Sequence, residues 1–156
     1  MRKDTPAGER GERGAALVET ALLLPLLVLL VFGIIEASWA FSQQNDVRFG
    51  AREGARLAAE NFGDVQDVAE EVCARMDTIY ASQTPTITLT AVSGSGNVDS
   101  IAEIEVEADS QTLTGLLDGM FSVRLGSTLQ FRVEVPTTAS ATDWWADPSG
   151  QSFTCT

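Results

Sequence analysis

Residues 14–35 read GAALVETALLLPLLVLLVFGII, and this stretch decides how the rest of the chain is organised. Between residues 15 and 35, Glu19 is the only charged residue. A helix rises about 1.5 Å per residue, so about 20 apolar residues match a hydrocarbon core about 30 Å thick. The stretch therefore predicts a transmembrane helix, which we assign to residues 15–36, behind a leader at residues 1–14.

The charges that flank this helix predict its orientation. The leader carries four basic residues, whereas the helix is followed on its other side by only Arg48 and Arg52 at a comparable distance. Because positive charge favours the cytoplasmic side, we expect a single-pass protein of the cytoplasmic (inner) membrane with an exported C-terminal domain. The basic residues of the leader are Arg2, Lys3, Arg10 and Arg13.

The composition excludes several classes of function. The chain has 22 acidic and 10 basic residues, a net charge of −12, which disfavours binding to nucleic acid or to an anionic lipid surface. It has no histidine, and its lysine lies in the leader, so His-based triads, imidazole metal sites and lysine Schiff bases are absent from the exported part. We expect no enzyme activity, no cofactor, no metal and no small-molecule substrate.

The helical pattern continues beyond the membrane. Residues 37–61 contain no proline and are rich in alanine, so we expect the first helix to extend over residues 37–62. Asp64 is a suitable N-cap for a second, amphipathic helix that reaches about Ser82. Its apolar side chains recur at helical spacing at Val65, Val68, Ala69, Val72 and Met76.

After Pro85 the apolar pattern changes to a period of two, which is typical of half-buried strands. Three strands are predicted within residues 86–91, 102–108 and 129–135, and residues 93–97 (SGSGN) read as a turn. A further short strand is possible at residues 123–125, after a short helix or an irregular segment.

These elements predict an α+β fold. We expect a small α+β domain at residues 63–136, with an antiparallel sheet of three to four strands. Such a sheet has one apolar face to cover, and the exported half of the first helix can cover it. Residues 137–156 are expected to form a flexible tail.

Cys73 and Cys155 both fall in the part expected to be exported, where an oxidising compartment permits a disulfide. Closing a loop of about 80 residues is worth about 4.5 kcal/mol in the chain-entropy account of disulfides. A disulfide and two unpaired thiols both remain open from the sequence.

Three features together resemble a known family. They are the leader that ends at Gly14, the carboxylate of Glu19 five residues later, and AREGARLAA at residues 51–59. Residues 11–60 are similar to the TadE-like pseudopilins, or minor pilins, of tight-adherence (Flp) pilus systems. The resemblance implies cleavage between Gly14 and Ala15 by a prepilin peptidase. It also implies partners among other pilins, pseudopilins and the pilus assembly platform.

The position of Glu19 has two interpretations. A charge within the hydrocarbon is costly, so Glu19 is a candidate to pair with the amine that cleavage would create on Ala15, of its own chain or of a neighbour. Alternatively, Glu19 lies near the cytoplasmic interface and reaches water.

Arg48, Arg52 and Arg56 are spaced by four residues and predict one basic stripe on the exported helix. The stripe is a candidate for contact with an acidic patch on a neighbouring subunit. Gly54, among small alanines, is a candidate for close subunit packing. The alternative is a solvated face balanced by acids of the same helix. In the first case the acidic patch of the neighbour would be Glu103, Glu105 and Glu107. In the second case the balancing acids would be Glu53 and Glu60.

Two other functional classes stay open. An uncleaved, membrane-anchored binding or adhesion protein would use the same helix only as a tether, and Trp144 and Trp145 would be candidates to contact its ligand. A secreted protein would be cut after Ala40 by a signal peptidase, although the apolar stretch exceeds the usual length of about 7 to 15 residues.

Overall fold

The computed structural model describes residues 8–60, 65–76, 84–115, 123–135 and 150–155, with side chains from residue 14 onward. Helix α1 spans Gly8–Ala59 without interruption and includes Pro25. It begins several residues before the predicted membrane segment, because extending an existing helix fixes one residue for each new hydrogen bond and costs little. Residues 61–64, where we expected the helix to end, lie outside the described part of the chain.

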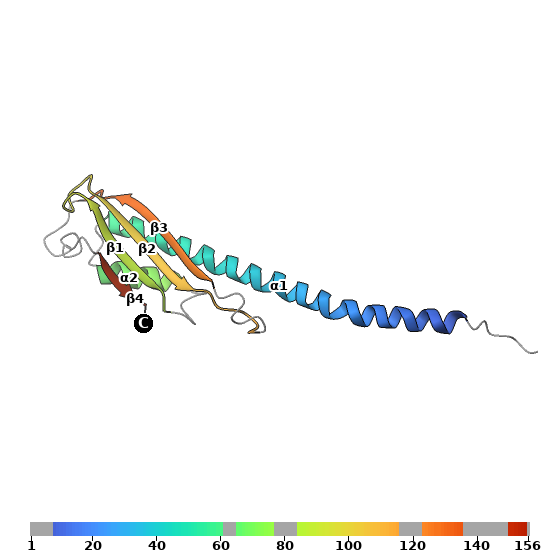
Figure 1. Cartoon of the computed structure of the whole chain (residues 1–156). Coiled ribbons are helices and arrows are strands. Elements are labelled where there is room, and N and C mark those ends of the chain that lie inside the picture. The colour runs from blue at the N-terminus through green and yellow to red at the C-terminus, as the bar shows by residue number, and fades with distance from the viewer. Residues whose placement is uncertain (1–7, 61–64, 77–83, 116–122, 136–149, 156) are drawn as a thin grey trace, which may run out of the picture.

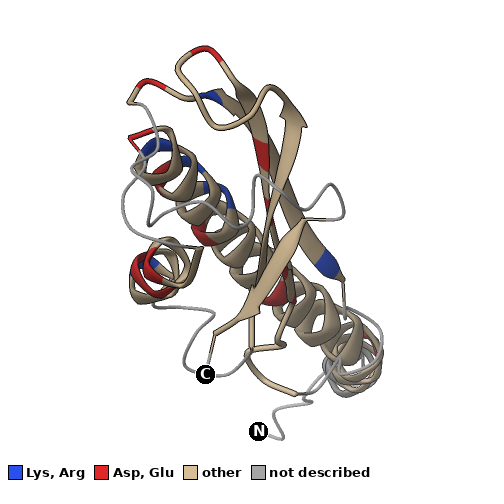
Figure 2. Cartoon of the chain, turned by 90° about the vertical axis from the view of Figure 1, so that its left-hand side faces the viewer, with Lys and Arg blue, Asp and Glu red and all other residues tan. Residues whose placement is uncertain are grey.

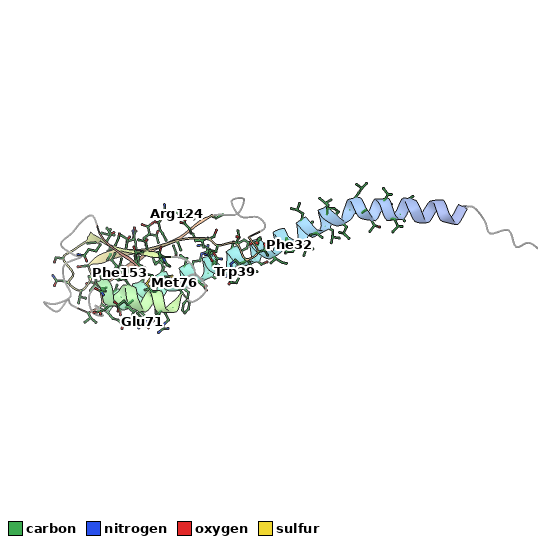
Figure 3. The ribbon with its side chains drawn as sticks, turned by 90° about the horizontal axis from the view of Figure 1, so that it is seen from below. Phe32, Trp39, Glu71, Met76, Arg124 and Phe153 are labelled. Carbon is green, nitrogen blue, oxygen red and sulfur yellow. A yellow bond between two sulfur atoms is a disulfide. The ribbon has the colours of Figure 1, made fainter. Side chains whose placement is uncertain are left out.

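The first half of α1 projects from the molecule as a bare rod (Figure 1). Its leucines are exposed, from 54% at Leu23 to 75% at Leu22. Among the described residues, α1 is the one helix that is long and apolar enough to cross a membrane. Figure 3 shows its side chains projecting on all sides, with the folded domain beginning near Trp39.

The domain contains one further helix and a four-stranded antiparallel sheet, which confirms the predicted α+β class. Helix α2 spans Val65–Arg75, and residues 77–82, where we expected it to continue, are not described. The strands lie in the order β3-β2-β1-β4. Their bounds are Thr86–Ser93 for β1, Ile101–Asp109 for β2, Arg124–Arg132 for β3 and Gln151–Thr154 for β4.

The C-terminal half of α1 and α2 cover one face of the sheet, and the other face is open (Figures 1 and 2). Along β2 the side chains at 102, 104, 106 and 108 are buried, whereas Glu103, Glu105 and Glu107 point to the open face. This alternation is the pattern expected of a sheet with one wet face. The core contains Val47, Ala51, Val72, Met76, Ile87, Leu89, Ile104 and Val106.

Two glycines allow α1 to approach its neighbours closely. A methyl group at Gly50 would lie 2.8 Å from Sδ of Met76, and one at Gly54 would lie 2.8 Å from Cγ2 of Val72 and would also meet Cδ1 of Ile104. Because Gly50 faces Met76 and Gly54 faces Val72, α2 runs antiparallel to α1 along this contact.

Strand β3 differs from its predicted bounds. It is continuous from Arg124 to Arg132, where the sequence suggested two shorter strands at 123–125 and 129–135. Register with β2 is unbroken from Arg124 opposite Asp109 to Arg132 opposite Ile101. Continuous pairing therefore overrides the turn-like composition around Gly126. Leu125, Leu129 and Phe131 of β3 all contribute to the core, and the period of two over residues 129–135 had predicted this for Leu129 and Phe131.

Part of the expected tail is ordered, which corrects the expectation of a flexible segment for residues 150–155. Strand β4 pairs with β1 from Thr86 opposite Thr154 to Leu89 opposite Gln151. A disulfide joins Cys73 on α2 to Cys155, and both residues are buried. β4 has only four residues, too few to produce a recognisable alternating pattern. Trp144 and Trp145 lie outside the described residues.

Candidate functional site

The predicted processing junction lies on the bare part of α1. Gly14, Ala15 and Glu19 are all exposed, and a methyl group added at Gly14 would have nothing within 4 Å. Ala15 and Glu19 are four residues apart in one helix, so their positions stack about one turn apart. The hydroxyl of Thr20, next to Glu19, donates to the Ala16 carbonyl over 2.8 Å, which occupies the polar group of Thr20 within its own helix.

The three arginines of the predicted stripe differ in their surroundings. Arg56 forms ion pairs of 2.9 Å with both Glu53 and Glu60 of the same helix, as in the solvated alternative. Arg48 and Arg52 are exposed, and neither forms an ion pair within the described part of the molecule. The stripe therefore consists of one neutralised arginine and two exposed cations.

Gly54 does not lie on a subunit surface, which corrects the expectation that it packs against a neighbour. It is buried between α2 and β2 of its own chain. The sequence correctly indicated close packing at this glycine, but the spacing of small residues alone does not distinguish a contact within the chain from one between chains.

Glu53 connects α1 to α2 through two arginines. Arg56 donates to its carboxylate, and Arg75 of α2 approaches the same oxygen at 3.9 Å. The hydrogen bond from Arg56 holds the pKa of the Glu53 carboxyl below its usual value, opposed by partial burial and assisted by the charges of Arg56 and Arg75. The same pair raises the pKa of Arg56, first through its hydrogen bond with Glu53.

A set of polar contacts that was not predicted from the sequence lies where the domain meets the rod. Glu36 is buried, with only 2% of its surface exposed, and its carboxylate accepts 2.9 Å hydrogen bonds from the backbone N–H groups of Leu113 and Thr114. The hydroxyl of Thr114 also donates to Glu36. About two turns along the helix, the Gln43 side chain exchanges two hydrogen bonds with the backbone of Gln111.

A signal for these contacts was present in the sequence. Glu36 and Gln43 lie seven residues apart, which places them on the helix face that continues as Val47, Gly50 and Gly54. A polar residue on a buried face must find partners, and here the partners are the backbone groups after β2. The side chain of Gln44 adds a hydrogen bond to the Gly126 carbonyl of β3 over 3.1 Å.

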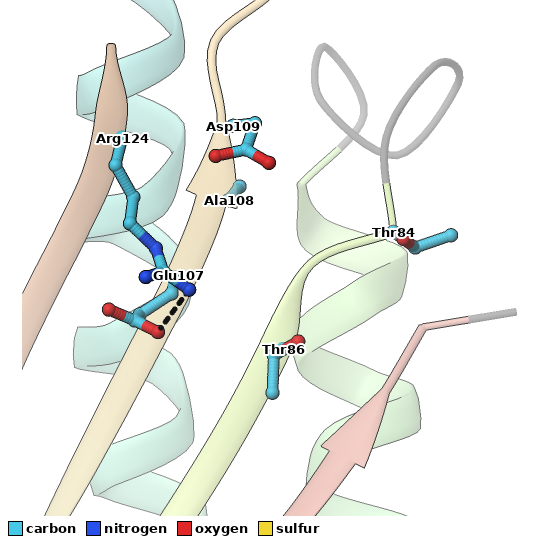
Figure 4. A pocket seen from close by; sticks show the side chains of 6 residues that line it. All are labelled: Thr84, Thr86, Glu107, Ala108, Asp109 and Arg124. Carbon is cyan, nitrogen blue, oxygen red and sulfur yellow. Dashed lines mark ion pairs between the residues drawn. The ribbon is translucent and has the colours of Figure 1, made fainter.

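A small pocket lies at the end of the acidic strand, between β1, β2 and β3 (Figure 4). Its volume is about 70 Å³, far below the roughly 300 Å³ at which small-molecule pockets begin. Glu107 and Arg124 form a 3.2 Å ion pair along one wall. No group of three candidate metal ligands comes together within the described residues. The lining residues are Thr84, Thr86, Glu107, Ala108, Asp109 and Arg124.

Comparison with protein families gives a match to an N-terminal segment that is less than a third of the chain. The family described as "TadE-like protein" matches residues 14–56, which run from the predicted cleavage junction to the last arginine of the stripe. This segment is TadE-like. The match confirms the resemblance noted in the sequence and suggests involvement in a tight-adherence pilus system with an N-terminal membrane helix.

The TadE-like segment contains the bare rod from Gly14 onward and most of the C-terminal half of α1, whereas α2 and the sheet follow it. TadE-like proteins are in general not enzymes. Among curated proteins and among solved structures, none gives a significant match to this chain.

Proposed function

We propose that this chain is a pseudopilin, or minor pilin, that acts in the assembly of a tight-adherence (Flp) pilus. The observation that carries the proposal is the TadE-like match, which begins at Gly14. Its physical support is the rod behind that residue, whose apolar side chains are exposed and require either lipid or other helices around them. Assembly is accordingly a binding function, with no enzymatic step performed by the chain itself.

In the proposed pathway, the leader stays in the cytoplasm and the domain is exported across the inner membrane. A prepilin peptidase then hydrolyses the bond between Gly14 and Ala15. The excess of basic residues in the leader supports this orientation. The disulfide between Cys73 and Cys155 is compatible with an exported domain, because disulfides persist in oxidising compartments.

Cleavage would leave a positive amine on Ala15, four residues before the carboxylate of Glu19. Two opposite charges in a low-dielectric environment attract strongly, and removing both from water is tolerable when they meet each other. The amine can meet Glu19 of its own chain or of a neighbour. The rods would then associate side by side with their other partners in the pilus system, the pilins, pseudopilins and assembly platform.

Mass spectrometry of the full-length protein extracted from membranes tests the proposal directly. A mature chain that begins at Ala15 is the expected result. A chain that begins at Met1, in cells that are making pili, would contradict processing and favour the uncleaved membrane-anchored binding or adhesion protein. A chain that begins at Phe41 would favour ordinary secretion.

A further inference from the structure

Arg48 and Arg52 lie on the side of α1 that faces away from α2. The side of α1 that contacts α2 is marked by Gly50, which meets Met76, and by Gly54, which meets Val72. Two residues along a helix turn the side chain by about 200°, and each arginine is two residues from one of these glycines. The arginines therefore lie roughly opposite the contact with α2.

The exposed side of α1 also carries an aromatic residue. Phe49 is 54% exposed although it lies 13 residues beyond Glu36, which is roughly 20 Å along the helix. At that distance it is too far from the end of the apolar rod to serve as an interfacial anchor. Arginine and aromatic residues are enriched in protein–protein contacts. We call Arg48, Phe49 and Arg52 the basic ridge.

The opposite side of the molecule is acidic. The exposed face of α2 carries Asp67, Glu70 and Glu71, and Figure 2 shows this acidic helix beside α1, which carries the arginines. Figure 3 shows Glu71 on the outer side of α2, away from the sheet. Glu71 forms a 2.9 Å ion pair with Arg75, and Gln66 donates to Glu70; over Val65–Arg75 the helix carries three acids and one arginine, a net negative charge.

We infer that the basic ridge binds the acidic face of α2 in a second copy of this chain, as a repeating side-by-side contact. This inference rests on the proposed function in that it describes how the assembled subunits are arranged. Because the two patches lie on opposite sides of one molecule, the contact is heterologous. A heterologous contact leaves one patch free at each end and can therefore add further copies without limit.

The spacing of the charges fits this contact. Arg48 and Arg52 are four residues apart, as are Asp67 and Glu71, so each pair is separated by about 6 Å along its helix. The glycine contacts place residue 72 level with 54 and residue 76 level with 50. Glu71 is then about level with residue 55 and Asp67 with residue 59.

A neighbour shifted by seven residues, about 10 Å along the rod, brings Glu71 level with Arg48 and Asp67 level with Arg52 at the same time. All rods remain parallel in this arrangement, as their common orientation in a membrane requires. The open face of the sheet is a less suitable partner. It carries two arginines, Arg124 and Arg132, whose side chains are 72% and 69% exposed and would repel the ridge, whereas the described residues of α2 include one, Arg75.

Charge reversal in the purified full-length chain tests this contact. Self-association is measured in detergent by energy transfer between labelled copies. Reversal of the ridge (Arg48→Glu with Arg52→Glu) and reversal of the helix (Asp67→Arg with Glu71→Arg) should each weaken association about tenfold, the equivalent of about 1.4 kcal/mol. Matched reversal on the sheet (Glu103→Arg with Glu105→Arg) should leave association within about twofold of the unmodified chain.

The decisive control is the four-fold variant, a single chain that carries all four substitutions of the ridge reversal and the helix reversal. It should associate with itself about as well as the unmodified chain, which also shows that the individual losses are not caused by misfolding. Mixing the ridge-reversed and helix-reversed chains should restore association in which the two kinds of chain alternate, because the ridge of each then meets a helix face of opposite charge on the other. Failure of the four-fold variant to recover association would overturn the inference, and so would a loss caused by the sheet variant alone.

This experiment is independent of the proposed function. It requires neither a peptidase nor a pilus, whereas the position of the mature N-terminus is measured in cells. A chain that retains its leader but shows the full reversal pattern would remove the pseudopilin proposal and leave the contact between copies intact.

Discussion

Gly54, whose side chain is a single hydrogen atom, allows α1 to pack closely against both α2 and β2. A methyl group there would meet Ile104 of β2 and lie 2.8 Å from Val72 of α2, and both neighbours are fully buried. We expect Gly54→Ala to lower the free energy of unfolding by about 1 to 3 kcal/mol, which is the usual cost of overpacking a core. Denaturant titration of the purified protein measures it.

Gly126→Ala is the matched control, because a methyl group at Gly126 has nothing within 4 Å. It should leave the free energy of unfolding within about 0.5 kcal/mol, as is usual for surface substitutions. Equal effects of the two substitutions would show that the close contact at Gly54 does not limit stability.

Glu53 makes stability depend on pH in the acidic range. Its pKa is lowered in the folded protein, so the carboxylate contributes stability above the unfolded pKa of about 4.5. That contribution is lost as the pH falls through the lower folded value. The free-energy difference between the unmodified protein and Glu53→Gln should therefore be present at pH 6 and should shrink as the pH drops below about 4.5. Denaturant titrations across this range measure the difference.

Glu105→Gln is the control for Glu53. Glu105 is an acid on the open face of the sheet and has no ion pair among the described residues. Its substitution should give a difference that changes little over the same range. A similar pH dependence for both variants would assign the effect to net charge instead of to the contact with Arg56 and Arg75.

At the level of elements, Glu36 holds the segment after β2 against α1. Glu36→Ala removes the acceptor for the backbone N–H groups of Leu113 and Thr114, so both donors lose their contact with α1 and turn to solvent. We expect these two amides to exchange hydrogen with solvent faster, while amides in the centre of β2 keep their protection. Glu36→Gln retains one acceptor oxygen and should have an intermediate effect.

The disulfide connects α2 to the end of β4. Cys73 and Cys155 are 82 residues apart, and a loop of that length corresponds to about 4.5 kcal/mol in the chain-entropy account. Replacing both cysteines with alanine should lower the free energy of unfolding by roughly 2 to 5 kcal/mol. Reduction of the unmodified protein should give a similar loss. Thermal unfolding with and without reductant measures both, and equal stability in all samples would contradict the prediction.

Long elements with strong periodicity were predictable from the sequence, and short or paired elements were not. The apolar rod and the alternation of β1 and β2 were identified because each repeats over many residues. β4 was missed because its four residues are specified by pairing with β1 and by Cys155, which are far away in sequence. β3 was divided wrongly because its glycine and serine suggest a turn, whereas pairing with β2 keeps them extended.

At the scale of the whole molecule, one part of the candidate site was predictable from the sequence and another part was not. The residues from Gly14 to Arg56 belong to a recognisable family segment, and their places on α1 follow from helical spacing. The acidic face of α2 could be read from the sequence, but its position opposite the basic ridge could not. That position depends on how α2 folds back against Gly50 and Gly54.

The proposed pairing of Glu19 concerns contacts between whole molecules. Under the proposed function, Glu19→Ala should still insert into the membrane, since it removes the one charge from the apolar stretch. It should lose piliation, because the new amine on Ala15 would have no partner in the assembled rods. Electron microscopy of cells carrying the variant measures piliation, and Glu19→Asp is the conservative control. Normal piliation by Glu19→Ala would exclude a role for the carboxylate.

The attachment of the sheet at both ends of the C-terminal half of α1 has a mechanical consequence. Glu36 holds the segment after β2 at the end nearer the bare rod, and at the far end the Ala59 carbonyl accepts a hydrogen bond from the Glu134 amide over 2.8 Å. A force that pulls on the rod along its axis therefore loads these attachments and the apolar contacts between them together, in shear. They must break at once instead of peeling apart in sequence, so the domain resists traction along the rod better than a pull at right angles to it.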